Sequence, residues 1–527
     1  MVKNAFDKKR KNKNRQLSSA YGNDMRDEIM VLGIDLGTTY SAAAYVDDNG
    51  EVQVVVNSEG KRLTPSVFFE ETENSIIIGD VAKENAYMQP QNVVRTVKNH
   101  MGKKKIFKTS SGKEYTPEFI SSYIIRKIVQ DAAAYAGVDK IEDVVITVPA
   151  YFNDAQRKAT EDAARIAGVN MIGSINEPTA AMLSYIHRKD LKEGKCMVYD
   201  LGGGTFDVSI VSLDGDLPEV IGKDGVPRTG GHFFDEAIVK YVCDVMAEKY
   251  DIDMEDEKYQ DEFQGLYLKA ENCKIQLSSR QSAKISLKVD DVKETIEITR
   301  ELFDSWVKRF YRNTEARMNN AIKAAGITVD QLDTVLMIGG SSRIPFIEKK
   351  VAEFTGKQPA RDINPDEAVA IGAALFGHMI QTNPDKKVFY DTTSQSVGFL
   401  YTKKDGTREN IKLIKKNSTL PATYTQDAVI MENYQARIDL SVTEGEQLEE
   451  EHIHIAETLS IDLPKGLKKN DPYTIQYTLD EFQLLYIKIE IPSVPSWHFE
   501  KKLKSSFNLT EEEVVAMTGI ALANTVS

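Results

Sequence analysis

The chain has 527 residues, of which 41% are hydrophobic, so it can form several folded cores and is not wholly disordered. At about 150 residues per domain, this length predicts roughly three or four units. The 66 basic and 80 acidic residues give a net charge of −14, which makes general nucleic-acid binding an unexpected function. Three separated cysteines, Cys196, Cys243 and Cys273, fit neither a disulfide scaffold nor a Cys-rich zinc site. No apolar run reaches the roughly 18 residues of a membrane span, so we expect no membrane association and a soluble, cytoplasmic protein.

The first 28 residues differ from the rest of the chain. Residues 8–15 hold six basic side chains in eight positions, and no apolar stretch follows them, so this is not a secretory signal. We expect a disordered basic tail at residues 1–28. A nuclear-targeting or polyanion-binding arm is the alternative interpretation.

Two large regions follow the tail. Over residues 29–384, apolar runs of strand length alternate with amphipathic helical segments, which is the α/β pattern. Two helices are clearly marked: one begins at the N-cap Thr116 and ends at Gly137, and another begins at Asn153, with Gln156 completing a capping box. Over residues 392–507 the hydrophobic period changes to two, which predicts a separate β-sandwich. Residues 385–391 join the regions and are more apolar than an ordinary linker, since they include Val388, Phe389 and Tyr390.

Phosphate chemistry is indicated first at residues 31–41, where an apolar strand runs into Asp35, a glycine turn and two threonines. Such a strand–turn–strand exposes backbone N–H groups, and Gly37 lets a phosphate approach closely. Thr38 and Thr39 add hydroxyl donors, and Asp35 can hold a hydrated Mg²⁺. Alone, this segment would be interpreted as an ordinary hairpin.

The design recurs about 165 residues later, at residues 198–210. Asp200 corresponds to Asp35, Gly202 corresponds to Gly37, and Thr205 offers another hydroxyl. A third segment, residues 335–345, is a buried strand followed by Gly339, Gly340 and a helix, and its Arg343 can stack on a base. Two hairpins that face each other can hold a nucleotide's phosphates and its metal from both sides.

These segments resemble the seventy-kilodalton heat-shock chaperones, the DnaK family, over nearly all of the chain from Leu32 onward. Further segments of the same kind are Thr64-Pro-Ser66, Val148-Pro-Ala-Tyr-Phe-Asn-Asp154, Ile175-Asn-Glu-Pro-Thr-Ala-Ala181 and Ile363-Asn-Pro-Asp-Glu-Ala-Val-Ala370. The resemblance implies an actin-like, two-lobed ATPase domain joined by an apolar linker to a β-sandwich that holds extended apolar peptides. It also implies ATP/ADP and Mg²⁺ as cofactors, with a J-domain co-chaperone and a nucleotide exchange factor as partners.

The resemblance assigns roles to individual residues. Lys98 corresponds to the lysine that aids attack on the γ-phosphate, and Glu177 to a carboxylate that orients metal-bound water. Asp35 and Asp200 correspond to the pair that organises Mg²⁺ through water. The implied phosphate contacts are Gly37, Thr38, Thr39, Tyr40, Gly202, Gly203, Gly204 and Thr205. The implied adenosine pocket consists of Glu271, Lys274, Ser278, Gly339, Gly340, Ser341, Ser342, Arg343 and Asp366. The implied relay between domains consists of Pro149, Arg157, Val388, Phe389, Tyr390 and Asp391.

Three segments depart from the family pattern. Gly230-Gly-His-Phe-Phe-Asp235 replaces a Gly-Gly-Glu-Asp-Phe-Asp segment, and the linker is shorter and more aromatic than usual. Residues 508–527 match only the start of the family's first lid helix, with Thr510 and Glu513 as a capping box. We expect this lid remnant to pack against the sandwich through Val514, Val515 and Met517, and we expect bound peptide to exchange quickly.

Several functions remain open at this point. The first is an ATP-driven chaperone that binds unfolded or extended polypeptide. A nucleotide-gated scaffold with one dedicated partner is the main alternative, because the linker and the lid depart from the family. A sugar or metabolite kinase shares the paired hairpins but lacks a sandwich, and a filament-forming, actin-like protein is the fourth possibility.

Overall fold

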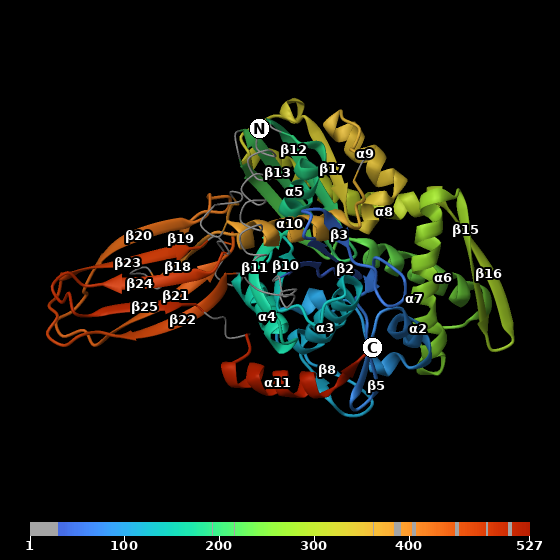
Figure 1. Ribbon diagram of the computed structural model, residues 1–527, viewed down its shortest axis with the longest axis horizontal. Coiled ribbons are helices and arrows are strands. Elements are labelled where there is room, and N and C mark those ends of the chain that lie inside the picture. The colour runs from blue at the N-terminus through green and yellow to red at the C-terminus, as the bar shows by residue number, and fades with distance from the viewer. Residues whose placement is uncertain are drawn as a thin grey trace, which may run out of the picture.

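The computed structural model describes residues 30–527 except 192, 215–216, 362, 384–390, 403–406, 448–452, 481–482 and 504–507. Residues 30–383 form an α/β domain of two lobes, and residues 391–503 form a β-sandwich that projects from one side of it (Figure 1). The expected fold class is confirmed: an actin-like, two-lobed α/β domain, an all-β sandwich and a short C-terminal helix. The basic tail and the linker residues Val388, Phe389 and Tyr390 lie outside the described residues.

The first lobe contains a mixed sheet in the order β11-β10-β1-β2-β3, with β4 paired to β2. Side chains alternate along β1: Leu32 and Ile34 face the core beneath α3 and α4, whereas Val31 faces the core on the side of α10. The bounds are β1 Val31–Asp35, β2 Tyr40–Val46, β3 Val52–Val54, β4 Thr64–Pro65, β10 Asp143–Val148, β11 Asn170–Asn176, α3 Pro117–Ala136, α4 Asp154–Ile166, α5 Glu177–Lys189 and α10 Ala368–Thr382.

A smaller sheet in the order β26-β6-β5-β7 and helix α2 complete the first lobe. Strands β5 and β6 form a hairpin, and β26, from the far end of the chain, joins the open edge of β6 in parallel. The bounds are β5 Phe68–Thr72, β6 Ser75–Ile78, β7 Val93–Val94, β26 Thr525–Val526 and α2 Asp80–Met88.

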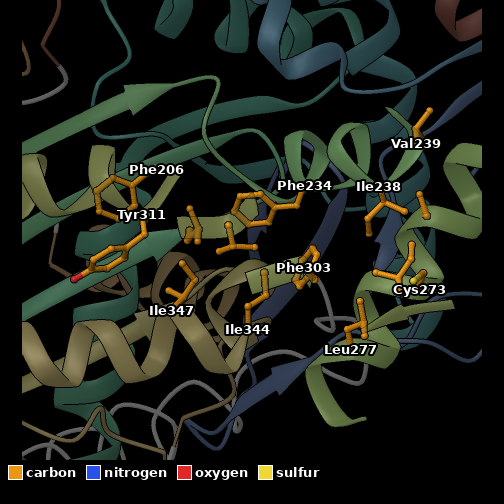
Figure 2. Close-up of a cluster of buried hydrophobic side chains, with 14 of the residues drawn as sticks. Phe206, Phe234, Ile238, Val239, Cys273, Leu277, Phe303, Tyr311, Ile344 and Ile347 are labelled. Carbon is orange, nitrogen blue, oxygen red and sulfur yellow. The ribbon is translucent and has the colours of Figure 1, made fainter. Parts of the chain in front are cut away.

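The second lobe is built on the four-stranded sheet β14-β13-β12-β17. Its largest apolar core lies between this sheet, the helices and a β15-β16 hairpin, and includes Phe206, Phe234 and Phe303 (Figure 2). The bounds are β12 Glu193–Leu201, β13 Thr205–Asp214, β14 Pro218–Pro227, β15 Ser282–Val289, β16 Val292–Thr299, β17 Thr334–Ile338, α6 Gly231–Tyr250, α7 Gln260–Ser279, α8 Arg300–Ala324 and α9 Pro345–Thr355.

The helix signals in the sequence correspond to real caps. The Thr116 side chain accepts a hydrogen bond from the Phe119 backbone N–H, and Gly137 ends α3 with φ 70°. Asn153 and Gln156 make both hydrogen bonds of the capping box at the start of α4. Both predicted helices are therefore confirmed, because each boundary depends on local backbone hydrogen bonding that its cap residues satisfy.

The sandwich consists of two four-stranded sheets, β19-β18-β21-β22 and β20-β23-β24-β25. The period-two pattern is confirmed, since Ile438, Leu440 and Val442 face the core between the sheets together with Ile487 and Ile489. The bounds are β18 Val397–Thr402, β19 Arg408–Ile414, β20 Ala422–Val429, β21 Arg437–Glu444, β22 His454–Asp462, β23 Pro472–Leu479, β24 Leu485–Glu490 and β25 His498–Lys502.

The expected packing of the C-terminal helix is wrong. Helix α11, Glu511–Ala523, packs on α3 and α4 of the first lobe and not on the sandwich (Figure 1). Val514 is buried there and Met517 is partly buried, but Val515 is exposed. The first lobe offers an apolar groove and an open strand edge, and the chain after α11 satisfies that edge through β26.

Candidate functional site

The two phosphate hairpins face each other across the cleft between the lobes. The turn after β1 carries Thr38 and Thr39, and the turn after β12 carries Gly203 and Gly204. A Cβ on Gly203 would lie 1.9 Å from Thr39 Oγ1, and a Cβ on Gly204 would lie 3.0 Å from Thr38 Cγ2. Only glycine at these positions lets the turns approach this closely, so the two turns lie in direct contact.

The third glycine segment closes the back of this volume. Gly339, which follows β17, has φ 79°, and a Cβ there would lie 2.7 Å from Asp200 Oδ1. The short helix Gly340–Arg343 then begins, and Ser341 donates from Oγ to the Gly202 carbonyl at 2.8 Å. Ser342 donates in turn to the Gly339 carbonyl at 2.7 Å. These contacts fix the third segment against the second hairpin.

Four carboxyl groups lie near enough to one another for their charges to interact: Asp35, Glu177, Asp200 and Asp207. Burial, followed by the neighbouring Glu177, raises the pKa of Asp35 to about 7. The pKa of Asp200 is raised well above its ordinary value by burial and then by the charges of Glu177, Asp207 and Asp35. Carboxyl groups gathered in this way repel one another when ionised, so the site favours a bound cation.

Lys98 is the cation that faces these carboxyl groups. It is buried in the short helix Val97–His100, and its Nζ donates to Glu177 Oε1 at the start of α5. The Lys98 Nζ also lies 5.9 Å from the centre of the Phe152 ring, so the ammonium has an apolar wall behind it. Lys98 and Glu177 are 79 positions apart in the sequence, and the fold brings them into direct contact.

Asp207 is the residue of this group that the sequence interpretation did not assign. It lies opposite Asp200 in the β12–β13 ladder and is fully buried, and neither of its carboxylate oxygens has a hydrogen-bond partner. Burial and the charge of Glu177 raise the pKa of Asp207 well above its ordinary value. The signal was present in the sequence, because Asp207 ends the segment Gly-Gly-Gly-Thr-Phe-Asp.

These features fit a divalent metal held through water. Two unpartnered buried oxygens on Asp207 and the mutual repulsion among the carboxyl groups both call for positive charge. Over the part of the chain that is described, no three His, Cys, Asp or Glu side chains lie close enough together to hold an ion directly. Water between the metal and the carboxylates would span that spacing, as Mg²⁺ commonly requires.

The predicted adenosine residues come together at the other end of the cleft. Lys274 on α7 donates to the Gly231 carbonyl at 3.0 Å and to Asp235 Oδ2 at 2.8 Å. Arg343 donates to Asp366 Oδ2 at 2.6 Å, and a Cβ on Gly231 would lie 2.6 Å from Ser341 Oγ. Glu271, Lys274 and Ser278 lie along one stripe of α7, and Ser278 donates to the Lys274 carbonyl at 3.4 Å.

A pocket at the mouth of the cleft is crossed by contacts between the lobes. Lys83 on α2 forms an ion pair with Glu271 on α7 at 2.6 Å, and it also donates to the Tyr40 hydroxyl at 2.7 Å. Arg95 in the first lobe donates to Gln264 on α7 at 2.9 Å. These contacts join the two lobes across the cleft.

The proposed relay residues lie between the cleft and the sandwich. Buried Arg157 donates to Asn176 Oδ1 at 2.8 Å, and Asn176 donates to Asp391, the last residue of the linker. Lys223 on β14 donates to Asp391 Oδ1 at 3.1 Å. Asn176 directly precedes Glu177, so the hydrogen bonds of Arg157 and Asp391 meet at the residue next to Glu177.

The segment after Pro149 makes the second contact of this interface. The Pro149 carbonyl accepts from the Phe152 N–H at 3.1 Å, which fixes a tight turn before α4. Within that turn, the Ala150 carbonyl accepts from the Ser394 hydroxyl of the sandwich. Asn176 stands in the segment Ile175–Ala181 but was given no role, and Lys223 and Ser394 belong to no motif. All three were missed because the partners that matter here are distant in the chain.

Comparison with known proteins gives one family. The family model described as "Hsp70 protein" matches residues 31–462. The chain is 34% identical to the "Chaperone protein DnaK" of Thermotoga neapolitana over 469 residues, which cover 87% of this chain and 77% of that protein. The proteins of the same name from Thermotoga petrophila and Thermotoga maritima match to the same extent. In the described part of the chain, no helix is long and apolar enough to cross a bilayer.

Proposed function

This chain belongs to the Hsp70 family and is an ATP-dependent molecular chaperone with ATPase activity, and we propose how its own residues carry out that activity. The family binds a nucleotide with a divalent metal, and it binds unfolded polypeptide. The observation that supports our assignment most directly is the pair of facing hairpins with Lys98, Glu177, Asp200 and Asp207 between them.

We assign ATP or ADP with Mg²⁺ to the cleft. The phosphates would contact the backbone of Gly202, Gly203 and Gly204 and the hydroxyls of Thr38 and Thr39. The adenosine would lie between α7 and the Gly340–Arg343 helix, where Lys274 and Arg343 are held by Asp235 and Asp366. Mg²⁺, held by Asp35 and Asp200 through water, would supply positive charge against the phosphates.

Hydrolysis requires a water in line with the γ-phosphate and stabilisation of the charge that develops there. Lys98 would supply the charge, because its ammonium is buried and already oriented by Glu177. Glu177 and Asp207 would position the water, and Thr205 would donate a hydroxyl to the phosphates. Water attacks phosphorus, the bond to the ADP oxygen breaks, and the products are ADP and inorganic phosphate.

We propose that polypeptide binds at the end of the sandwich farthest from the α/β domain. Strand β20 begins beside Asp391 and ends at Val429, and the turn that follows exposes Met431 by 72% and Tyr434 by 79%. Large apolar side chains so exposed at one end of a sheet are typical of a recognition surface. An extended peptide there would gain apolar contacts and hydrogen bonds to strand edges.

Partners and location complete the proposal. A J-domain co-chaperone and a nucleotide exchange factor are inferred from family membership. We propose no nucleic-acid and no membrane partner, in keeping with the acidic net charge of −14. Free cysteines, two of them buried, fit a reducing, cytoplasmic setting.

The assignment is tested by Lys98→Ala. We expect turnover of ATP to fall by about 10²-fold or more while nucleotide binding survives, because Lys98 acts mainly in the transition state. Lys108→Ala, which alters an exposed lysine of the same lobe, is the control. Formation of ADP, the product common to an ATPase and a kinase, is measured with unfolded peptide and, separately, with a panel of sugars. Stimulation by a sugar and not by peptide would favour the kinase alternative, and parental turnover in Lys98→Ala would refute the role of Lys98.

A further inference from the structure

Two carboxyl groups meet across the interface between the domains, away from the nucleotide cleft. Asp154 is the first residue of α4, and Glu444 is the last residue of β21 in the sandwich. A small cavity lies between them, and its other lining residues are Ala155, His454, Ala456, Leu485 and Leu503. Apart from Ala155, every one of these other residues belongs to the sandwich.

The two groups line the same cavity but do not neutralise each other. Asp154 Oδ1 is buried with no hydrogen-bond partner, and the charge of Asp154 adds to burial in raising the pKa of Glu444. His454 Nδ1 lies 3.9 Å from Glu444 Oε2, too far for a hydrogen bond. Two carboxylates that line one small, largely apolar cavity are poorly tolerated when both are ionised.

The charged groups around the pair do not compensate for its burial. Lys502 on β25 and Arg157 and Lys158 on α4 face Asp154, as does the acidic Asp480 of the sandwich. Arg157 is held by Asn176, and Lys158 is held by Asp162. Burial dominates these charges and raises the pKa of Asp154 to about 7 and that of Glu444 to about 8.

Docking of the sandwich is what buries this pair. Without the sandwich, Asp154 would lie at the exposed N-terminus of α4, where the helix dipole favours its ionised form. Glu444 would likewise no longer be covered by α4 and would be exposed to solvent. Both groups therefore have ordinary acidity when the domains separate and hold a proton more tightly when they dock.

We propose that Asp154 and Glu444 form a proton-linked clasp, so that the sandwich docks with a proton held at this pair and is released more readily as pH rises. The clasp is independent of the nucleotide site and supplies a second input to the same domain movement. Its effect on docking does not depend on which polypeptide is bound to the sandwich.

The direction follows from linkage. A carboxyl group that binds protons more tightly in the docked form contributes its full docking strength below its undocked pKa, near 4. That contribution declines as pH rises and levels off above the docked pKa of about 7 to 8. The docking constant then falls by up to about tenfold per pH unit for each carboxyl group that takes up a proton. The ion pair of Asp224 with Lys416, elsewhere in this interface, holds the pKa of Asp224 below its ordinary value, so it titrates outside this window.

The test measures docking directly in the full chain. Small-angle X-ray scattering from pH 5.5 to 8.5, at fixed ionic strength and without nucleotide, reports the fraction of extended molecules. We expect the wild-type protein to extend as pH rises. Glu444→Gln should stay docked to higher pH with a shallower dependence, because an amide keeps the shape without the charge, and Asp154→Asn should do the same. Asp439→Asn, on the exposed side of the same strand, should leave the curve unchanged.

His454→Gln separates the clasp from its histidine neighbour. The proposal requires that Glu444→Gln flattens the pH dependence and that His454→Gln leaves most of it in place. If only His454→Gln flattens the curve, the histidine is the sensor and the proposal is wrong. A wild-type curve that is flat from pH 5.5 to 8.5, or a Glu444→Gln curve that coincides with it, would also refute the clasp. Circular dichroism at each pH shows that every variant is folded.

Discussion

At the scale of single residues, the site contains buried carboxyl groups that destabilise the folded protein when no ligand is bound. Asp207 is fully buried, and neither carboxylate oxygen has a partner. A group of this kind destabilises the folded protein in the absence of a bound cation that compensates its charge. Stability and activity should therefore respond in opposite directions when Asp207 is neutralised.

We predict that Asp207→Asn raises the stability of the protein without nucleotide or metal, and that ATP turnover falls. The pKa of Asp207 is raised on folding, so unfolding releases a proton and rising pH favours the unfolded chain. The unfolding free energy of Asp207→Asn should exceed that of the wild-type protein by a margin that grows by up to about 1.4 kcal/mol per pH unit above pH 4. Urea unfolding in EDTA from pH 5 to 8 measures it, with Asp439→Asn as control. Equal unfolding free energies at every pH would contradict the prediction.

Cys273 makes a second prediction at this scale. It lies beside Lys274 in sequence, yet it faces the second-lobe core with Leu277 and is 1% exposed (Figure 2). Burial raises the pKa of its thiol to about 11. We expect slow alkylation in the native protein and unchanged nucleotide binding in Cys273→Ala. Mass spectrometry after timed iodoacetamide treatment gives the alkylation rate of Cys273 and, for comparison, that of the half-buried Cys243. Fast labelling that ATP blocks would place the thiol in the pocket instead.

Apart from those assigned by family resemblance, the residues that the sequence identified are those whose type is dictated by local geometry. Gly203 and Gly339 must lack a Cβ, and Thr116 must cap a helix, so each leaves a signature in a short segment. Lys83 and Lys223 carry no such mark, because their importance comes from partners about 190 and 170 positions away in the chain. Contacts of that range depend on the whole fold, and a single sequence does not display them.

At the scale of elements, helix α11 shows what local signals leave undetermined. Its start was predicted correctly, since Thr510 and Glu513 make both hydrogen bonds of the capping box. Its partner was not, because the helix is apolar on more than one face: Val514 is 2% exposed and Val515 is 62% exposed. Because the helix has no single apolar stripe, its sequence does not show which face is buried or which part of the protein it packs against. In the folded protein, Arg126 of the first lobe fixes the end of the helix by donating to the Asn524 carbonyl at 3.0 Å.

This pair of neighbouring valines gives a matched prediction. Val514→Asp should cost about 1.5–3 kcal/mol of unfolding free energy or release the helix, because it exchanges buried apolar area for a charge. Val515→Asp, one residue later, should be nearly neutral. Thermal unfolding and limited proteolysis after residue 508 measure the two effects. Equal stability of the two variants would show that α11 does not rest on α3 and α4.

At the scale of the whole molecule, the order of domains could be read from the change in hydrophobic period, but their docking could not. The interface uses polar pairs spread over the chain, including Asp391 with Lys223 and Lys416 with Asp224. Asp391, the last residue of the linker, contacts Asn176, which directly precedes Glu177. A change in the cleft therefore has a short route to the base of the sandwich, and the docked state depends on ion pairs and on the carboxyl clasp together.

The pair of Lys416 and Asp224 allows the coupling to be tested. Lys416 lies 2.6 Å from Asp224, whose other oxygen accepts from Asn320 at 2.8 Å, so the carboxylate is fixed before the sandwich arrives. Lys416→Asp should weaken docking by about 1.5–3 kcal/mol, since it removes a charged hydrogen bond and adds repulsion. Basal ATP turnover should persist while its response to peptide is lost. Adding Asp224→Lys restores opposite charges, and docking should recover. Lys415→Asp, at the exposed neighbouring position, is the control for charge alone. Scattering and peptide-stimulated phosphate release are measured for each variant, and a Lys416→Asp protein that stays docked and stimulated would exclude this pair from the coupling path.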